Sequence, residues 1–266
     1  MEPLVPEKKL AEGKEKVVVT TGRDSVVRIR FKKDPLDWSV PFRVAQTCDI
    51  FTLLRFRGVK NHFVDEYDNM SFRALNCKMI PLEVVVRRTA PPQSSYLKRN
   101  TRVKKGTIFC DLIVEFFYKD DKQNDPFVYI GADDETWLLF DKTKPVTERG
   151  EIGSIPALLP EVDVARIKNM ARKSFLILEE AFARVGVTLH DLKEEYGRVI
   201  SGCDAGTIVL ADTITGDEMR LAEHGTILDV DVFRASVDMA TIEKKHFRIA
   251  KFTEIFLDFL EEDVSV

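Results

Sequence analysis

The feature that most restricts the fold of this chain is one long amphipathic run, from Asp163 to Val185. Asp163 stands in the first turn of the predicted helix, and Gly186 follows at a position that suits a helix end. Apolar residues recur every three or four positions, so one face carries Val164, Ile167, Ala171, Phe175, Leu178 and Phe182. This run is the clearest helix that the sequence predicts.

The apolar runs before this helix are short and rich in β-branched and aromatic residues. Two of them, Val17–Thr20 and Ser25–Phe31, flank a Gly-Arg-Asp turn and predict a hairpin. The stretch Phe72–Val86 predicts two core strands that meet at a bend at Pro81, and Leu112–Tyr118 predicts another strand.

Further helices, loops and strands complete the outline. Val44–Phe56 and about Ser236–Glu261 predict helices, whereas Asp141–Glu161, with three prolines and two glycines, predicts mostly loop. Val187–Tyr196 and Thr207–Ala211 predict a second hairpin. A strand-rich beginning followed by mixed strands and helices predicts an α+β fold of two lobes, with a ligand in the cleft between them.

The composition excludes several classes of protein. With a formal net charge of -4, the chain is a poor candidate for general nucleic-acid binding, which depends on clustered Lys and Arg. Its four cysteines are far apart and form no CxxC pair, so neither a zinc site nor a disulfide framework is expected. The sequence shows no signal-peptide pattern and no apolar run of about 18 residues. We therefore expect a cytoplasmic protein without a membrane or nucleic-acid partner.

Charged residues stand at the ends of several apolar strands, where the fold would position them. Glu12–Lys16 reads EGKEK, in which glycine lets the backbone approach a phosphate that lysine neutralises; a solvated turn is the alternative. Arg87 and Arg88 end a buried run, with Ser95 soon after. This set predicts an anion pocket, because the guanidinium fork fits carboxylate or phosphate, although a structural Arg–carboxylate pair explains it equally well.

Two later motifs predict a site for Mg²⁺ and phosphate. The acidic loop Lys119–Pro126 follows a strand and offers carboxylate oxygens, although an exposed turn would have the same composition. On the predicted strand, Asp191, Lys193 and Glu195 point to one face, and the hairpin would bring Asp212 near them. The alternative for this second motif is a cross-strand ladder of salt bridges.

Together and in this order, these motifs resemble the SAICAR synthetase family (phosphoribosylaminoimidazole-succinocarboxamide synthase). The matching segments are EGKEK at 12–16, MIPLEVVVR at 79–87, SYLKR at 95–99, KDDKQNDP at 119–126, DLKEEYG at 191–197, and LAD at 210–212 with RL at 220–221. A late Phe-Arg pair at 233–234 extends the match.

The resemblance implies a two-lobed fold related to ATP-grasp enzymes, with the active site between the lobes. Residues 1–85 would form a β-rich nucleotide-binding lobe, and residues 86–266 an α+β lobe with the substrate and Mg²⁺ sites. The implied reaction, a step of de novo purine biosynthesis, joins L-aspartate to the carboxylated imidazole ribotide CAIR. ATP drives it through an acyl phosphate, giving SAICAR, ADP and phosphate, with ATP and Mg²⁺ as cofactors. The oligomeric state stays open, a homo-oligomer included.

The resemblance also implies a role for each matching residue. Those facing ATP would be Lys14, Lys16, Lys78, Met79 and Glu83. Those facing the ribotide would be Arg87, Ser95, Arg220 and Arg234. Mg²⁺ would bind Glu195 and Asp212, while the catalytic residues would be Lys193, Lys119 and Asp125.

The sequence departs from the family pattern between Asp34 and Phe51. The family has a longer segment there, with a Ser/Thr-Ala-Gly loop and a Gly-Lys-Gly that help to hold the ribotide. Gly131–Pro160 is in turn longer than the family pattern leads us to expect. Two alternatives therefore stand beside the ligase: a diverged phosphotransferase or ligase of the same fold with another substrate, and a non-catalytic nucleotide-binding homologue.

Overall fold

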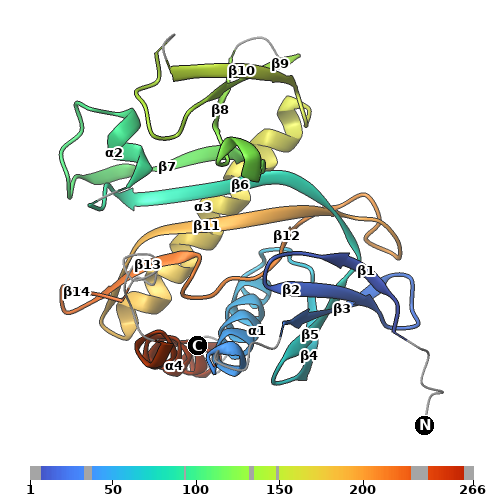
Figure 1. Cartoon of the computed structure of the whole chain (residues 1–266). Coiled ribbons are helices and arrows are strands. Elements are labelled where there is room, and N and C mark those ends of the chain that lie inside the picture. Colours follow the sequence, from blue (N-terminus) through green and yellow to red (C-terminus); the bar gives the residue numbers. More distant parts are fainter. Residues whose placement is uncertain are drawn as a thin grey trace.

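The computed structural model describes residues 7–32, 38–92, 94–131, 135–147, 150–228 and 239–260. Within these residues the chain forms two antiparallel sheets, of five and nine strands, together with long helices (Figure 1). The predicted α+β class is confirmed. None of the helices in these ranges is both long enough and apolar enough to cross a lipid bilayer.

The smaller sheet is built from the N-terminal strands, in the order β1-β2-β3-β5-β4. Its strands are β1 (Lys9–Glu12), β2 (Lys16–Thr20), β3 (Val26–Phe31), β4 (Phe63–Asp68) and β5 (Ser71–Leu75). Strands β2 and β3 pair antiparallel, which confirms the first predicted hairpin.

The larger sheet holds most of the remaining strands, in the order β10-β9-β8-β7-β6-β11-β13-β14, with β12 paired to β11. The strands are β6 (Cys77–Thr89), β7 (Ile108–Tyr118), β8 (Phe127–Ile130), β9 (Thr136–Phe140), β10 (Glu151–Pro156), β11 (Val187–Val199), β12 (Ile208–Ala211), β13 (Met219–Glu223) and β14 (Thr226–Ile227). The pairing of β11 with β12 confirms the second predicted hairpin. The chain passes from one sheet to the other at Asn76, and a functional division at residue 85 remains a prediction.

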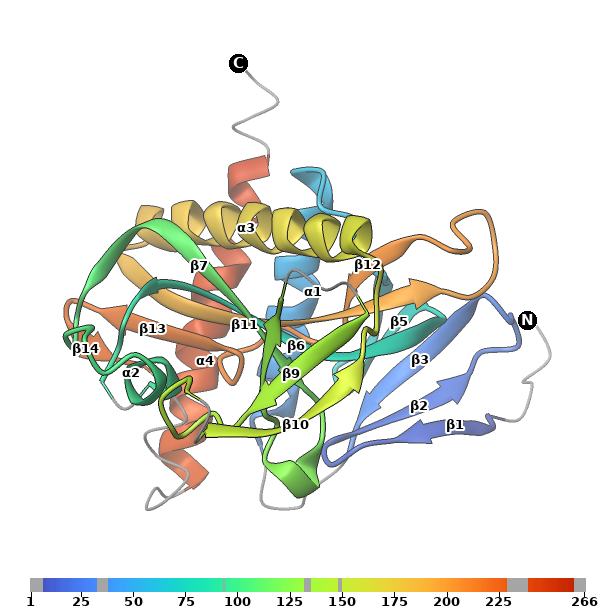
Figure 2. The same cartoon turned by 90° about the horizontal axis from the view of Figure 1, so that it is seen from above.

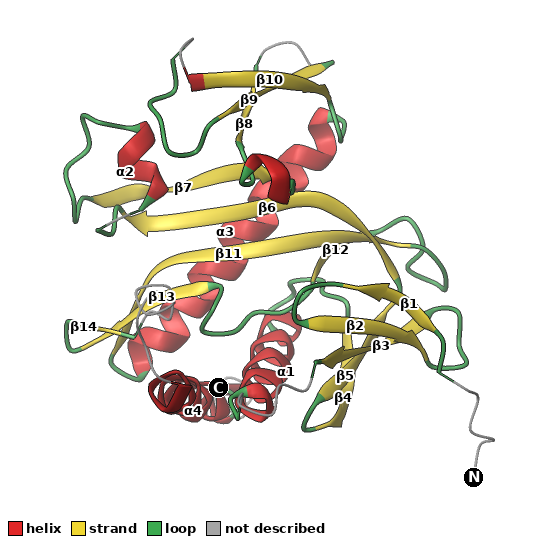
Figure 3. Ribbon diagram, viewed as in Figure 1, coloured by secondary structure: helices red, strands yellow, loops and turns green. Residues whose placement is uncertain are grey.

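The long helix α3 (Glu161–Arg184) covers one face of the larger sheet, as Figures 2 and 3 show. All six predicted apolar residues of this helix are buried, because they pack toward β11, β6 and β7. The other helices are α1 (Val40–Phe56), the short α2 (Ser95–Arg99), a 3-10 turn at Asp121–Gln123, and α4 (Met239–Ile255). Helices α1 and α4 pack against each other. The predicted start of the last helix, Ser236, lies outside the described residues.

One prediction about strands is wrong, and one strand was not predicted. Pro81 does not separate two strands, because β6 runs through it from Cys77 to Thr89. Its missing N–H is tolerated where the register between β6 and β11 shifts, and its carbonyl accepts a hydrogen bond from the Lys119 amide at 3.0 Å. The stretch Asp141–Glu161 is mostly loop in its described residues, as predicted, but it also contains β10, which was not predicted and which pairs with β9 despite Gly153.

Gly197 of β11 is a sensitive position in this sheet. It lies opposite Met79 of β6, and a Cβ at this position would lie 2.7 Å from Cβ of Cys77 and 3.2 Å from Sδ of Met79. Gly197→Ala therefore forces the two strands apart and should lower the free energy of unfolding by about 1–3 kcal/mol. Urea unfolding followed by circular dichroism measures this change. Unchanged stability would mean that β6 moves away from β11 at no cost.

Candidate active site

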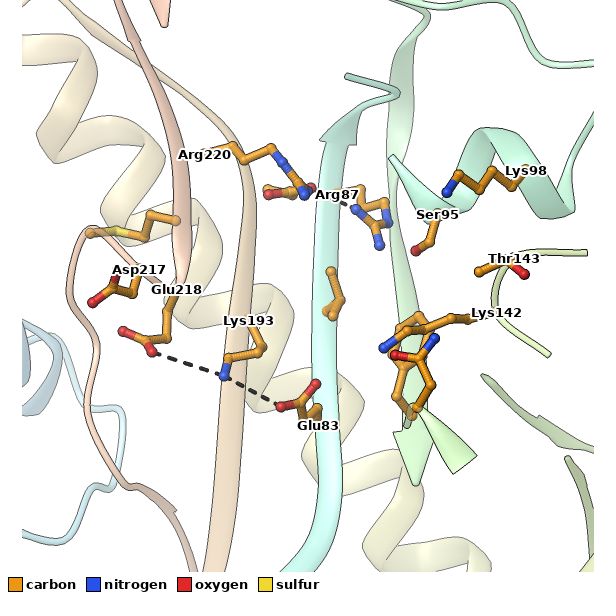
Figure 4. A pocket seen from close by; sticks show the side chains of 15 residues that line it. Glu83, Arg87, Ser95, Lys98, Lys142, Thr143, Lys193, Asp217, Glu218 and Arg220 are labelled. Carbon is orange, nitrogen blue, oxygen red and sulfur yellow. Dashed lines mark hydrogen bonds and ion pairs between the residues drawn. The ribbon is translucent and has the colours of Figure 1, made fainter. Parts of the chain in front are cut away.

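A cavity of about 420 Å³ opens on the face of the larger sheet (Figure 4). Alternate residues of β6 and β11 line it, namely Glu83, Val85 and Arg87 from one strand and Asp191 and Lys193 from the other. The intervening residues of these strands point to the opposite face, which α3 covers. The alternation of the two strands therefore places most of the charged groups in the cavity, and the opposite face is apolar except for the buried Glu194.

Lys193 lies between carboxylates in this cavity. Its Nζ is 3.4 Å from Oε1 of Glu83, and 3.9 Å from Oε1 of both Glu195 and Glu218. Burial opposes the ammonium charge, but the surrounding carboxylates, with Glu218 first, outweigh that cost and raise the pKa of Lys193. Lys193 is therefore a fixed positive charge across the physiological pH range.

Two further lysines pair with the carboxylates next to Lys193. Nζ of Lys119 contacts both oxygens of Glu195 at 2.8 Å. Nζ of Lys16, from β2 of the smaller sheet, contacts Oδ1 of Asp212 at 2.6 Å. Both sheets therefore contribute to one cluster of alternating charges, and the hairpin does bring Asp212 into the neighbourhood of Lys193.

The charges of Glu195 and Asp212 also repel each other, and this affects their pKa values. Burial and the neighbouring charge of Asp212 raise the pKa of Glu195, with Lys119 opposing. For Asp212, burial pushes the pKa upward, but Lys16 and the other lysines lower it overall. Two buried carboxylates that repel each other suit a divalent cation, which would neutralise both.

The carboxylates of Glu195 and Asp212 are a set of ligands that fits Mg²⁺ if the substrate supplies the other ligands. Among the described residues, no group of three or more His, Cys, Asp or Glu gathers in a metal-binding arrangement. Mg²⁺ usually takes only one or two protein carboxylates and completes its shell with phosphate and water. Glu195 and Asp212 meet that requirement.

The side of the cavity away from the carboxylates carries lysine and hydroxyl side chains. Ser95 and Lys98 of the α2 region face Lys142 and Thr143 of the loop after β9 (Figure 4). Ammonium groups beside hydroxyl donors form a site for carboxylate or phosphate.

Two of the three predicted arginines also reach the cavity, where they form ion pairs with carboxylates. Arg87 is buried, and it donates to Glu115 at 2.8 Å and to Asp191 at 2.6 Å. Arg220 donates to the same oxygen of Asp191 at 2.5 Å. Arg87 therefore agrees with both interpretations of the sequence. It lines the cavity, as an anion-binding residue would, and it also forms a structural ion pair with carboxylates.

Several other predicted residues that the structure describes lie outside the cavity lining. The neighbours of Lys193 in the charged cluster, namely Lys16, Lys119, Glu195 and Asp212, are outside it as well. Lys14 forms an exposed ion pair with Asp121 at 2.8 Å. Lys78 and Met79 are exposed on β6. Asp125 accepts a hydrogen bond from the Asp120 amide and helps to shape the loop. Arg234 lies outside the described residues.

Known proteins share this arrangement of chain and sheets. A sequence profile of SAICAR synthetase matches residues 42–249. The chain belongs to the SAICAR synthetase family. A phosphoribosylaminoimidazole-succinocarboxamide synthase of Herpetosiphon aurantiacus is 30% identical over 261 residues, which cover 93% of this chain and 95% of that protein. A Roseiflexus relative of the same name is 34% identical over 240 residues, covering 85% and 86% of the two chains.

Solved SAICAR synthetases have the same fold. The phosphoribosylaminoimidazole-succinocarboxamide synthase of Ehrlichia chaffeensis superposes with a TM-score of 0.72 at 23% identity, covering 93% of this chain and 98% of that one. A SAICAR synthetase in complex with ADP superposes with a TM-score of 0.68 at 26% identity, covering 90% and 96%. The predicted SAICAR synthetase-like fold is thereby confirmed, whereas the relation to ATP-grasp enzymes stays a prediction.

Sequence reasoning missed several groups that line the cavity of this family member. Lys142 and Thr143 come from a stretch predicted only as loop, and no local pattern places them opposite Ser95. Asp217 and Glu218 were also missed, although an acidic pair two residues before Arg220 was a usable signal.

Glu194 lies on the face of β11 that is turned away from the cavity. Its environment predicts how the stability of the fold depends on pH. It is buried against α3 and accepts hydrogen bonds from Ser174 and, at 2.7 Å, from the Tyr196 hydroxyl. Burial raises the pKa of Glu194 from 4.5 to about 7, although both hydrogen bonds lower it. The folded state therefore holds a proton that the unfolded chain releases near pH 4.5.

The stability contributed by this proton is full below about pH 4.5, falls as pH rises, and is lost above about pH 7. Glu194→Gln removes the titration. The difference in unfolding free energy between the two proteins should therefore change by about 3 kcal/mol between pH 4 and pH 8. Urea unfolding across that range measures the difference. A constant difference would show that Glu194 ionises normally in the folded state.

Proposed function

We infer that this chain is an ATP-dependent carbon–nitrogen ligase that joins L-aspartate to CAIR and yields SAICAR, ADP and phosphate. The observation that supports this most directly is Lys193, held among carboxylates in a cavity whose far side carries Lys98 and Lys142. The names of the relatives and the ADP complex of one solved neighbour support the same reaction.

The reaction requires that the negative charge of the phosphates is neutralised and that the reacting groups are held in position. A carboxylate is a poor electrophile, so ATP first converts it to an acyl phosphate with a good leaving group. Lys193 remains protonated and would neutralise the transferring phosphoryl group, with Lys119 and Lys16 close by. Mg²⁺ held by Glu195 and Asp212 would supply further neutralisation of the phosphates.

The basic side of the cavity would bind the anionic ribotide. Lys98 and Lys142 offer charge, while Ser95 and Thr143 offer hydroxyl donors. Arg220 would contribute its guanidinium from the edge of the cavity, where its side chain is 26% exposed. These fixed donors would hold the carboxylate of the ribotide still while it reacts.

The test is ADP release with Mg-ATP, omitting CAIR or aspartate in turn, with the product identified by mass. ADP release that requires both substrates, together with SAICAR, establishes the ligase. A folded chain that binds nucleotide and forms no SAICAR refutes it. Size-exclusion chromatography would determine the oligomeric state, and fractionation would test the cytoplasmic location.

A diverged ligase or phosphotransferase remains the second candidate, and one feature favours it. Helix α1 begins at Val40, so residues 40–51 are helical, and the family's Gly-Lys-Gly is absent from the sequence there. If ADP release persists with another carboxylate in place of CAIR, the substrate has changed while the Lys193 cluster is retained.

A further inference from the structure

We propose that Glu218 binds the α-ammonium group of the incoming amino acid and removes its proton, so that the amine can attack the acyl phosphate. The inference rests on the proposed function and assigns a catalytic residue to its second half. Glu218 is in the loop before β13, and its side chain lines the cavity with 12% of its surface exposed.

The two oxygens of Glu218 have different surroundings. Oε2 accepts hydrogen bonds from the amide and the hydroxyl of Thr215, at 2.9 and 2.8 Å. Oε1 faces Lys193 at 3.9 Å, and in the described part of the chain no donor lies within hydrogen-bonding distance of it. Thr215 therefore fixes the carboxylate and leaves one oxygen directed into the cavity.

The distribution of charge separates two kinds of ligand. Glu218 and Asp217 lie on one side of Lys193, and the basic side with Lys98 and Lys142 lies on the other (Figure 4). Asp217 pairs with the guanidinium of Arg43 at 2.9 Å, which offsets part of its charge, whereas Glu218 faces Lys193 at 3.9 Å. Anionic groups of the ribotide belong on the basic side, and a cationic amine belongs beside Glu218.

The reaction needs a base at this position. An α-ammonium group is largely protonated near neutral pH and has no lone pair for attack. Glu218 takes one proton, and the free amine attacks the carbonyl carbon of the acyl phosphate. The C–N bond forms, the C–O bond to phosphate breaks with its electron pair, and the second proton leaves with phosphate. Glu218 then returns its proton to water.

The protonation behaviour of Glu218 supports this role. Burial raises the pKa of Glu218, while Lys193 opposes the rise and the charge of Asp217 adds to it. A carboxylate with a raised pKa is a stronger base than an exposed one.

The experiment compares two nucleophiles with Glu218→Gln and a matched control. Hydroxylamine is unprotonated at neutral pH and converts an acyl phosphate to a hydroxamate without help from a base. Glu223→Gln is the control, because Glu223 is on the same strand β13 and pairs with Arg248 at the surface. ADP release is measured with CAIR and either aspartate or hydroxylamine.

We expect Glu218→Gln to lower kcat/KM for aspartate by about 100-fold or more and to change hydroxylamine-dependent ADP release by less than about threefold. Equal losses with both nucleophiles, or unchanged turnover with aspartate, would overturn the inference. If hydroxylamine does not reach the intermediate, positional isotope exchange in ATP with CAIR alone replaces it as the measure of the first step. An unmodified chain that forms neither SAICAR nor the acyl phosphate overturns the proposed function, and Glu218 loses this role with it.

Discussion

Lys193→Ala should lower the rate of SAICAR formation by about 100- to 1,000-fold and leave the chain folded. Lys193 supplies a fixed positive charge in a partly enclosed cavity, where a preorganised charge stabilises a transferring phosphoryl group more than it does in water. Because the loss is in the transition state, we expect kcat to fall more than the affinity for ATP. Steady-state ADP release and nucleotide-binding calorimetry measure the two quantities.

The fold should tolerate this change because two of the three neighbouring carboxylates keep other partners, and the third, Glu83, is 21% exposed to water. Glu195 retains Lys119, and Glu218 retains its hydrogen bonds from Thr215. Lys173→Ala is the control, since its ammonium is exposed on α3 and donates to the carbonyl of Gly58 at 3.1 Å, away from the cavity. A large fall in thermal stability with full activity per folded molecule would instead support the salt-bridge ladder.

Glu115→Gln should lower the free energy of unfolding by about 3–5 kcal/mol. Glu115 lies on β7 and is buried between two guanidinium groups, with Arg87 at 2.8 Å and Arg99 at 2.5 Å. Both arginine side chains are almost fully buried, and Arg99 also packs against the rings of Phe117 and Phe127. Removing the carboxylate charge leaves two cations without full compensation away from water.

Urea unfolding at neutral pH measures the Glu115 effect, and a surface pair provides the control. Glu179 pairs with Arg88 at 2.7 Å, but both side chains are partly exposed, at 29% and 22%. Glu179→Gln should therefore cost about 1 kcal/mol or less. Equal losses in the two variants would mean that water reaches Glu115 as freely as it reaches Glu179.

Local patterns in the sequence were sufficient for most elements. The helical period placed the apolar face of α3 correctly, and the alternation along Asp191–Glu195 put Lys193 on the cavity face. Pro81 misled the prediction of β6, because a proline ends a strand only where the ladder needs its N–H. The shifted register beside β11 removes that need, and no local pattern reveals a register shift.

The sequence by itself determined the long helix α3 with its apolar face, the two hairpins, and which motifs of the SAICAR synthetase family are present. Only the tertiary structure decided which distant charges meet. Lys16 contacts Asp212 across 196 residues of chain, and Lys119 contacts Glu195 across 76. Periodicity is a property of neighbouring residues, so the sequence reveals it directly. Contacts between distant residues depend on how the two sheets pack, and that packing is fixed only when the whole core forms.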